Sequence, residues 1–369
     1  MIFSKCALLA TMAGMAAAVP INKNTCSSES VCTFTDAHSV RTGKNSCSII
    51  ILDNIEVPAG ETLDLTGLNK GTTVIFSGTT SFGYKEWEGP LISMSGDSII
   101  VKQAPGGRIS GGGERWWDGQ GGNGGKTKPM FFHANKLQNS HIDGLQVFNS
   151  PVHTFIIQST DHLSLSNIFI DDRAGDRVNG GHNTDGFGIF SSTYITIDNA
   201  VVYNQDDCLA IKSGDYITFQ NGYCSGGHGL SIGSVGGRDN NNVTNVLIRN
   251  SQIVDSENGV RIKSVSETTG LISGITYENI SLTNISRYGI DVQQDYLNLG
   301  PTGIPTNGVN ITDIKLNNIY GTVQSTGTDI YLLCGTESCS NWDWQNINVT
   351  GSTTSNECTN MPSGVPCKV

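Results

Sequence analysis

Four short segments between residues 184 and 263 repeat one pattern: TDGFGIF at 184–190, DDCLAIK at 206–212, GHGLSIG at 227–233 and NGVRIK at 258–263. In each segment two apolar residues alternate with a small or polar residue, which is typical of a β-strand. The pattern recurs after 22, 21 and 30 residues, counted from its first apolar positions Phe187, Leu209, Leu230 and Val260. Repeats at such intervals indicate a solenoid, so the segments are predicted to lie one above another.

The same pattern extends outward in both directions. VHTFIIQ at 152–158 fits 32 residues before the first segment, and YGIDVQ at 288–293 follows the last after another 30. No run of helical periodicity is long enough for crossover helices, so a doubly wound sheet is not expected. The sequence therefore predicts an all-β fold, a right-handed parallel β-helix whose coils stack at the strand spacing of about 4.8 Å.

The open apolar end of the first coil needs a cap, as solenoids generally do. We predict a short capping helix from Thr35 to about Gly43, with Thr35 as its N-cap. Because a solenoid grows in one dimension, residues 19–369 can form a single parallel β-helix domain. Within it, residues 19–31 are predicted to be a pro-segment or an N-terminal tail.

The N-terminus has the pattern of a secretory signal peptide over residues 1–18. Lys5 precedes an apolar run, and Ala16-Ala17-Ala18 ends it at the expected cleavage point. No later segment approaches the ~20 apolar residues of a membrane span. The protein is therefore predicted to be secreted and extracellular.

The ten cysteines agree with secretion, because eight of them can be paired outside the signal. Close spacing or neighbouring coils suggest the pairs Cys32–Cys47, Cys208–Cys224, Cys334–Cys339 and Cys358–Cys367. Cys26 is left over, and no spacing matches a zinc site, so no metal is predicted. Five sequons are predicted on turns or outer positions, at Asn242, Asn279, Asn284, Asn310 and Asn348.

Polar residues collect at the strand entrances in this alignment. One column holds Asp185, Asp207, His228 and Asn258, with Asp206 one position earlier. Arg261 and Lys263 are two residues apart and so share the outward face, where the positions equivalent to Lys263 are Lys212, Gly233 and Gln293. Single polar residues before strands are usually turn formers. The convergence of six charged or imidazole groups on one patch instead predicts a functional site.

The chain has 22 Lys and Arg against 33 Asp and Glu, for a formal net charge of −11. This balance argues against nucleic acid or an anionic membrane as a partner. A local cluster of His228, Arg261 and Lys263 on such a chain predicts a carboxylate-binding subsite. The alternative is an ion-pair patch that neutralises the aspartates, and both interpretations can hold together.

NTD at 183–185, DD at 206–207, GHG at 227–229 and RIK at 261–263, followed by QQDY at 293–296, resemble the polygalacturonases. The similarity to fungal-type endo-acting members covers nearly the whole mature chain. It implies a glycoside hydrolase that cleaves α-1,4 galacturonosidic bonds of homogalacturonan (pectate) with inversion. It further implies a monomer without cofactors, and plant polygalacturonase-inhibiting proteins as a partner.

By motif, the resemblance gives Asp206 the role of general acid and makes Asp185 and Asp207 the pair that activates water. Asp206 is expected to hold a proton near working pH, because neighbouring carboxylates disfavour another negative charge. His228 is expected to support that proton state or to bind sugar hydroxyls. The further substrate-binding residues are Asn183, which orients the site, and Arg261, Lys263 and Tyr296, which hold one galacturonate unit.

Two departures from the family pattern stand out. Many relatives have an aspartate where this chain has Gly188, and several endo-acting relatives have an acidic residue where this chain has Arg287. We expect Gly188 on the outward face in the column of Ala210, Ser231 and Arg261, open to solvent. The alternatives are an exo-acting or rhamnogalacturonan-directed hydrolase of the same fold, a calcium-dependent pectate lyase, and a catalytically weakened pectin-binding relative.

Overall fold

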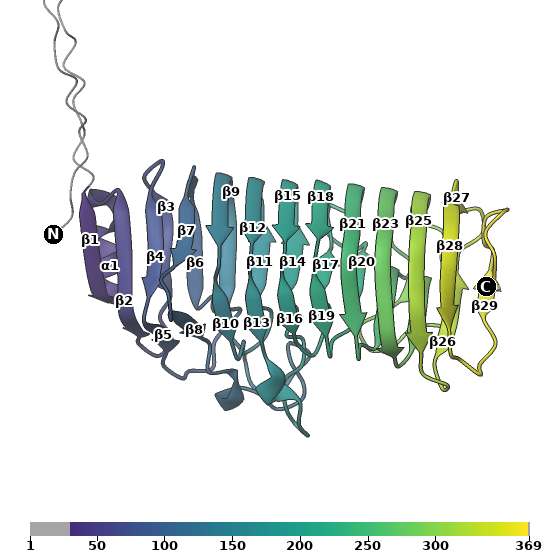
Figure 1. Cartoon of the computed structure of the whole chain (residues 1–369), viewed down its shortest axis with the longest axis horizontal. Coiled ribbons are helices and arrows are strands. Elements are labelled where there is room, and N and C mark those ends of the chain that lie inside the picture. The colour runs from purple at the N-terminus through teal and green to yellow at the C-terminus, as the bar shows by residue number, and fades with distance from the viewer. Residues whose placement is uncertain (1–29, 368–369) are drawn as a thin grey trace, which may run out of the picture.

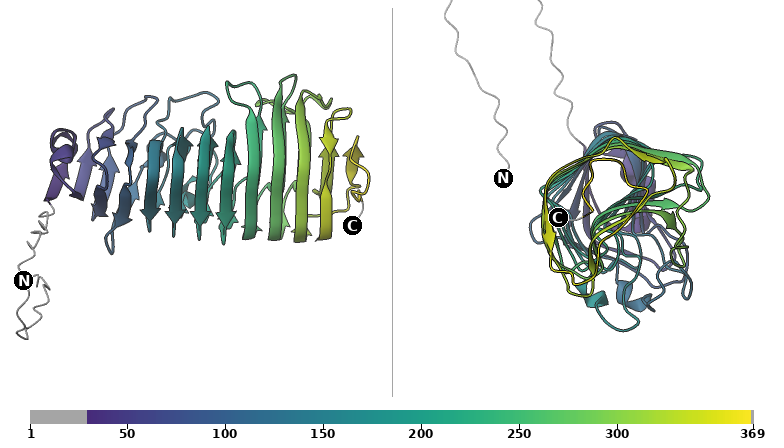
Figure 2. Two further views of the ribbon diagram at one scale, coloured as in Figure 1. Left: turned by 90° about the horizontal axis from the view of Figure 1, so that it is seen from above. Right: turned by 90° about the vertical axis from the view of Figure 1, so that its right-hand side faces the viewer.

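The computed structural model describes residues 30–367. Its strands pair in parallel and run as one stack from β1 (Val31–Asp36) at one end to β29 (Glu357–Thr359) at the other (Figure 1). Seen along the stack, the chain winds around a common axis (Figure 2). The predicted parallel β-helix is confirmed, and right-handed winding is the usual sense for parallel crossovers.

The strands form three ladders. The first ladder contains β3 (Leu63–Leu68), β6 (Ile92–Asp97), β9 (Phe132–Asp143), β11 (Phe155–Gln158), β14 (Phe187–Phe190), β17 (Leu209–Ile211), β20 (Leu230–Val235), β22 (Asn258–Val265), β24 (Tyr288–Tyr296), β26 (Thr328–Leu333) and β29. The second contains β1, β2 (Ile49–Val57), β4 (Thr73–Ser77), β7 (Ile100–Gln103), the end of β9, β12 (Asp161–Ser166), β15 (Ser192–Asp198), β18 (Gly214–Gln220), β21 (Asn242–Val254), β23 (Gly270–Ile285), β25 (Val309–Val323), β27 (Cys339–Ser340) and β28 (Asp343–Thr350). The third contains β5 (Thr79–Phe82), β8 (Arg108–Ser110), β10 (Gln146–Phe148), β13 (Phe169–Asp171), β16 (Val201–Tyr203) and β19 (Tyr223–Ser225), and it joins β2 and β21.

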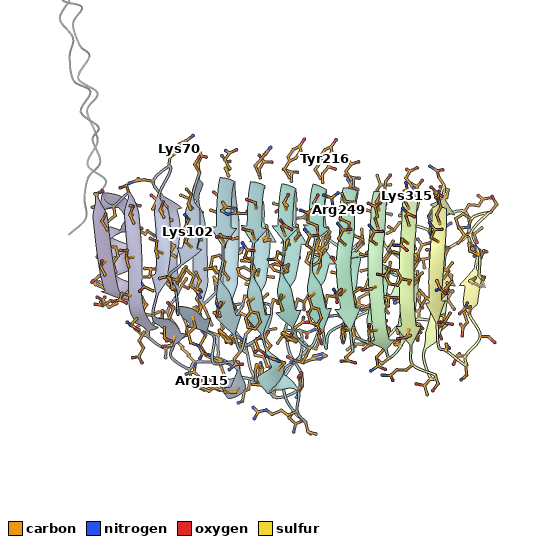
Figure 3. All side chains as sticks on the ribbon, in the orientation of Figure 1. Lys70, Lys102, Arg115, Tyr216, Arg249 and Lys315 are labelled. Carbon is orange, nitrogen blue, oxygen red and sulfur yellow. A yellow bond between two sulfur atoms is a disulfide. The ribbon has the colours of Figure 1, made fainter. Side chains whose placement is uncertain are left out.

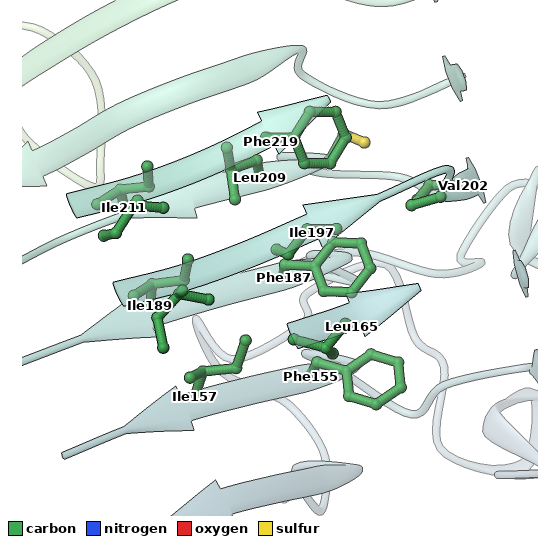
Figure 4. Packing of buried hydrophobic residues seen from close by; sticks show 14 of the residues in the cluster. Phe155, Ile157, Leu165, Phe187, Ile189, Ile197, Val202, Leu209, Ile211 and Phe219 are labelled. Atoms are coloured by element: carbon green, nitrogen blue, oxygen red, sulfur yellow. The ribbon is translucent and has the colours of Figure 1, made fainter. Parts of the chain in front are cut away.

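The register of the first ladder is the one that the repeats predict. Phe187 pairs with Leu209, Leu209 with Leu230 and Leu230 with Val260. The apolar positions point inward, where like residues of successive coils stack, as Phe155 and Phe187 do with ring centroids 5.4 Å apart (Figure 4). Each fully buried side chain of this size stabilises the fold by roughly 1.5–3 kcal/mol, so a one-residue slip would be costly.

The capping helix is present, but its predicted N-cap is wrong. Helix α1 covers Ala37–Gly43, and Oδ1 of Asp36 accepts a hydrogen bond of 2.8 Å from the backbone N–H of Ser39. Thr35 cannot take this role because β1 continues to Asp36, which pairs with Glu56 of β2. The short carboxylate directly before the helix is the group that reaches the unpaired amide.

Three 3₁₀ turns complete the helical content of the described residues: η1 (Lys44–Ser46), η2 (Gly113–Arg115) and η3 (Arg173–Gly175). Figure 3 shows that Arg115, at the end of η2, lies on the lower edge of the stack, away from Tyr216 on the upper edge. Loops at η2 and η3 therefore extend the molecule on one side only (Figure 1).

All four predicted disulfides are confirmed: Cys32–Cys47, Cys208–Cys224, Cys334–Cys339 and Cys358–Cys367. The asparagines of the five sequons are exposed, as expected for outer positions, and their glycosylation stays a prediction. Among the described residues, no helix is long and apolar enough to cross a membrane. The signal peptide, Cys26 and most of the 19–31 segment lie outside the described residues.

Candidate active site

A cleft of about 460 Å³ lies over the first ladder at strands β14 to β24. It is lined by all eight residues that the sequence singled out: Asn183, Asp185, Asp206, Asp207, His228, Arg261, Lys263 and Tyr296. They come from coils up to 113 positions apart in the chain (from 183 to 296) and meet because the coils stack. The structure therefore brings the complete predicted set together.

Backbone hydrogen bonds set the positions of the acidic residues before they enter their strands. The N–H of Gly186 donates to the carbonyl of Asp207 at 2.9 Å, and the N–H of Thr154 donates to that of Asp185 at 2.8 Å. The buried amide of Asn204 donates to the carbonyls of Asp206 and Asp207, at 2.9 and 3.1 Å. Asn204 thus holds the two adjacent aspartates in place, a role that its sequence position did not reveal.

Asp206 makes contacts through both of its carboxylate oxygens. Oδ2 accepts from Nδ2 of Asn183 at 2.8 Å, and Oδ1 lies 3.1 Å from Nδ1 of His228 and accepts from the N–H of Asp207 at 2.7 Å. Burial by itself raises the pKa of Asp206, but the charges of His228 and Lys263 outweigh it and hold the pKa well below its usual range. This direction runs against the expectation that Asp206 holds a proton, and its role as general acid stays a prediction.

Asp185 shows the opposite behaviour. Its side chain is buried, and His153 Nε2 lies 3.8 Å from its Oδ1. Burial, followed by the negative charge of Asp206, raises the pKa of Asp185 well above its usual range. Of these two carboxyl groups, Asp185 is therefore the one whose surroundings favour the protonated form.

Asp207 is the carboxylate to which the cations are bound. Its Oδ2 accepts from Nζ of Lys263 at 2.8 Å, and its Oδ1 accepts from Oγ of Ser231 at 2.6 Å and lies 3.7 Å from Nη1 of Arg261. On its other side, Arg261 Nε donates to Oδ2 of Asp291 at 3.2 Å. Both predicted carboxylate-binding cations thus neutralise aspartates of the protein, as the alternative interpretation proposed.

His228 lies in a chain of charges. Its Nδ1 faces Asp206, its Nε2 lies 3.3 Å from Oε2 of Glu257, and Oε1 of Glu257 accepts from Nη1 of Arg287 at 2.8 Å. Burial lowers the pKa of His228, but Asp206 and Glu257 outweigh it and raise the pKa to about 9. Arg287, one of the two departures, is therefore the residue that pairs with Glu257 at the rim of the cleft.

Tyr296 closes the set near the cations. Its ring centroid lies 5.1 Å from Nζ of Lys263 and 6.0 Å from Cζ of Arg261, and its hydroxyl donates to Oδ1 of Asn298 at 3.0 Å. On the opposite side, the N–H of Gly122 donates to Oδ1 of Asn183 at 3.0 Å. The two loops that carry Gly122 and Asn298 thus border the cleft.

Ligand atoms of Asp206, Asp207 and His228 lie within 4.8 Å of one another, a spacing that could hold a cation. Protein donors already occupy these carboxylates, however, with Lys263 on one and Asn183 on the other. The arrangement fits an internally satisfied acid–base group, and the absence of a metal requirement stays a prediction.

Residues 47–367 match the family described as glycosyl hydrolases family 28. The chain belongs to this family. It is 59% identical over 359 residues to endopolygalacturonase B of Aspergillus niger, covering 97% of each chain, and 61% identical over 336 residues to a probable endopolygalacturonase B of Aspergillus fumigatus, covering 91% of this chain and 92% of the other. Among solved structures, endopolygalacturonase I of Stereum purpureum complexed with two galacturonate superimposes with a TM-score of 0.79 at 35% identity, covering 87% of this chain and 95% of that one. The protein is a glycoside hydrolase.

Sequence reasoning missed several residues of the family 28 site. Ser231 and Asp291 bond to the site, and both lie in the ladder column of Arg261. The sequence placed Ser231 in that column without giving it a role, and extending the column by one coil would have added Asp291. Glu257 precedes its strand in a turn, and no pattern in the sequence distinguishes it from a turn former.

The raised pKa of His228 predicts how the stability of this family 28 enzyme depends on pH. Because the folded-state pKa is about 9 against 6.5 for the free side chain, the contribution is complete below pH ~6.5 and is lost as pH rises through 9. We expect His228→Asn to lower the free energy of unfolding by on the order of 2–3 kcal/mol below pH ~6.5. This difference from the wild type should disappear as the pH rises through 9. Thermal unfolding of both proteins between pH 5 and 9.5 measures it.

The difference between wild type and variant is the relevant quantity, because buried Asp172, whose pKa burial raises to about 8, titrates in the same window. His38→Asn, at an exposed histidine of α1, is the matched control and should keep the wild-type curve. A constant difference in Tm between wild type and His228→Asn across this pH range would contradict the prediction.

Gly188 has the predicted register but not the predicted exposure. It pairs with Ile156 and Ala210, and a Cβ added to it would lie 3.1 Å from Cδ1 of Ile156 and 3.3 Å from Cε2 of Phe190. The position is buried, so the expectation that a side chain here points to solvent is wrong. The two apolar side chains fill the space that a side chain at this position would need.

Gly188→Asp should therefore lower thermal stability rather than only tune the site, because it buries a carboxylate against apolar groups. We expect a loss of about 2–4 kcal/mol in the free energy of unfolding, measured by denaturant titration. Gly188→Ala is the control and should cost much less, since its φ lies outside the left-handed region and only a methyl group is added. Wild-type stability of Gly188→Asp would show that Ile156 and Phe190 move aside freely.

Proposed function

We propose that this protein is a secreted endopolygalacturonase that hydrolyses α-1,4 galacturonosidic bonds of homogalacturonan with inversion. The observation that carries the proposal is the cleft in which Asp185, Asp206 and Asp207 meet His228, Arg261 and Lys263. The identity of 59–61% to Aspergillus endopolygalacturonases over more than nine tenths of the chain supports the substrate class. The disulfides of the described residues agree with an oxidising compartment.

In the proposed reaction Asp206 protonates the leaving oxygen. His228 Nδ1, 3.1 Å from its Oδ1, is placed to pass a proton to it. A bound galacturonate carboxylate adds negative charge and removes water. Both changes raise the pKa of Asp206, which His228 and Lys263 otherwise hold low. Substrate binding therefore creates the protonated acid that the reaction needs.

Asp185 and Asp207 are proposed to activate the attacking water on the other side. Both oxygens of Asp207 accept hydrogen bonds from Ser231 and Lys263, whereas no protein donor lies within hydrogen-bonding distance of the Asp185 carboxylate among the described residues. Asp185 is thus the group with free acceptor capacity for a water. It must first lose the proton that burial favours, which the positive charge of Lys212 assists.

Arg261, Lys263 and Tyr296 are proposed to hold one galacturonate unit beside Asp207. The carboxylate of the sugar would then share the cations with Asp207 and Asp291 instead of meeting free charges. A monomeric state and recognition by plant polygalacturonase-inhibiting proteins stay predictions from the resemblance.

Reducing-end release from polygalacturonate tests the proposal. An endo-acting hydrolase lowers the viscosity of the polymer early and yields products of mixed length, whereas an exo-acting one releases a single short product. Polarimetry or NMR of the first product distinguishes inversion from retention. An absence of reducing ends, or an ultraviolet-absorbing unsaturated product, would reject the proposed hydrolysis.

A further inference from the structure

One cation of the cleft forms no ion pair and no hydrogen bond with the described residues. Arg261, Lys263 and Arg287 form ion pairs, and Nη1 of Arg238 donates to the carbonyls of Ser234 and Gly236 at 2.8 and 3.2 Å. Lys212 also lines the cleft, but its ammonium has no carboxylate within 4.0 Å and no hydrogen bond to residues 30–367. Its one close contact is the ring of Phe190, whose centroid is 5.0 Å from Nζ.

The backbone holds Lys212 in a defined place. Its N–H donates to the carbonyl of Ile189 at 2.9 Å, directly after β17, so its side chain belongs to the column that continues through Gly233 to Lys263. Gly233 has no side chain, so nothing in the intervening coil of this column separates the two lysines. Two coils of about 4.8 Å each place the lysines roughly 10 Å apart along the stack, more than the length of one pyranose ring.

Lys212 lies directly after β17, in the same coil as Asp206 and Asp207 and one coil beyond Asp185. Its charge acts on Asp185, whose pKa burial and Asp206 raise and Lys212 lowers. A half-buried ammonium without a partner, in a cleft rich in carboxylates, is available for an anion that enters with the ligand. Such a contact is strengthened by the partial exclusion of water.

We propose that Lys212 forms a second carboxylate-binding subsite, which holds a uronate unit of the polysaccharide different from the one at Arg261 and Lys263. The inference rests on the proposed function and deepens it, because it names a determinant of preference for de-esterified over methyl-esterified polymer. The ligand class is a chain of hexuronic acids whose carboxylates are free. The ring of Phe190, whose centroid is 5.0 Å from Nζ, lies beside the end of this side chain.

The test compares Lys212→Met, which keeps the apolar stem on Phe190, with Lys212→Arg, which keeps the charge. On polygalacturonate we expect Lys212→Met to raise KM about tenfold, the loss of one charge-assisted contact. A smaller fall in kcat is expected as well, because Lys212 also lowers the pKa of Asp185. Lys212→Arg should restore most of the affinity. On pectin with half of its carboxylates methyl-esterified, the rise in KM should shrink to about threefold or less.

Binding without turnover provides the second arm. Calorimetric titration of hexagalacturonate into Asp206→Asn and into Asp206→Asn/Lys212→Met should show about tenfold weaker binding for the double variant. Lys315→Met, an exposed lysine of β25 labelled in Figure 3, is the matched control for loss of one positive charge and should leave both measurements unchanged. Because Lys212 has no ion pair or hydrogen bond to residues 30–367, its replacement by Met should leave Tm within about 1 °C of the wild-type value.

The outcomes separate this inference from the proposed function. If wild type releases no reducing ends, the proposed hydrolysis fails, while the titration still tests whether Lys212 binds uronate. If Lys212→Met lowers kcat and shifts the pH profile on both substrates while KM stays constant, Lys212 acts only on Asp185 and the subsite is overturned. Equal losses of affinity for esterified and de-esterified polymer would overturn it as well.

Discussion

Asp206→Asn is expected to lower kcat on polygalacturonate by about 10²–10⁴-fold and to leave binding measurable. The asparagine keeps the size of the side chain and an acceptor oxygen, but it cannot deliver a proton to the leaving oxygen. Its amide can also no longer accept through both atoms from Asn183 and His228, which contact the carboxylate at 2.8 and 3.1 Å. Initial rates of reducing-end release, with calorimetric binding of an oligogalacturonate, measure both effects.

Asp343→Asn is the matched control, because Asp343 is an exposed aspartate of β28 outside the cleft. It should retain wild-type kcat and KM. If Asp206→Asn retains more than about a tenth of the wild-type rate, Asp206 is not the general acid. In that case Asp185, whose pKa is raised by burial and by Asp206, becomes the candidate for the general acid.

Lys263→Ala is expected to reduce both activity and stability strongly. Lys263 and Asp207 are 4% and 2% exposed and form a 2.8 Å ion pair. Removing the lysine leaves the buried Asp207 carboxylate with the hydrogen bond from Ser231 and the longer contact to Arg261. Breaking such a pair costs about 3–5 kcal/mol. Turnover should fall by about 10² or more, because Asp207 loses the donor that positions it.

The choice of substrate distinguishes the two interpretations of this lysine. A common loss on pectate and on methyl-esterified pectin reports the pairing with Asp207, and any additional loss on pectate alone reports a contact with the sugar carboxylate. Denaturant unfolding measures the stability term, and Lys315→Ala on β25 controls for the charge. Wild-type stability together with wild-type kcat would show that the Lys263–Asp207 pair is dispensable.

The corrections to the sequence expectations have one origin. Gly188 was placed on the right face of the right strand, yet Ile156 from the preceding coil and Phe190 from its own strand cover it. Thr35 was placed at the correct end of the helix, but β1 pairs with β2 as far as Asp36, so Asp36 is the N-cap. In both cases the local pattern was correct, and a neighbouring segment decided the environment.

The ladder itself could be predicted because its information is local and repeated. Alternating apolar residues specify which side of each strand faces the core, and a slip by one residue would reverse every one of them. The alignment of Phe187, Leu209 and Leu230 therefore identified the fold, the register and the convergence of the acidic residues. The four cysteine pairs followed from the same stacking or from short spacing.

The sequence alone thus determined the fold, the column of strand entrances and eight of the residues that line the cleft. Only the tertiary structure decided which charges neutralise one another. Lys263 pairs with Asp207 across 56 residues, whereas Lys212 has no carboxylate within 4.0 Å among the described residues. The tertiary structure also decided where the protons reside, raising the pKa of Asp185 and lowering that of Asp206. Periodicity specifies the direction of a side chain, whereas pairing and protonation depend on distances of a few ångströms and on burial, which arise only when the coils stack.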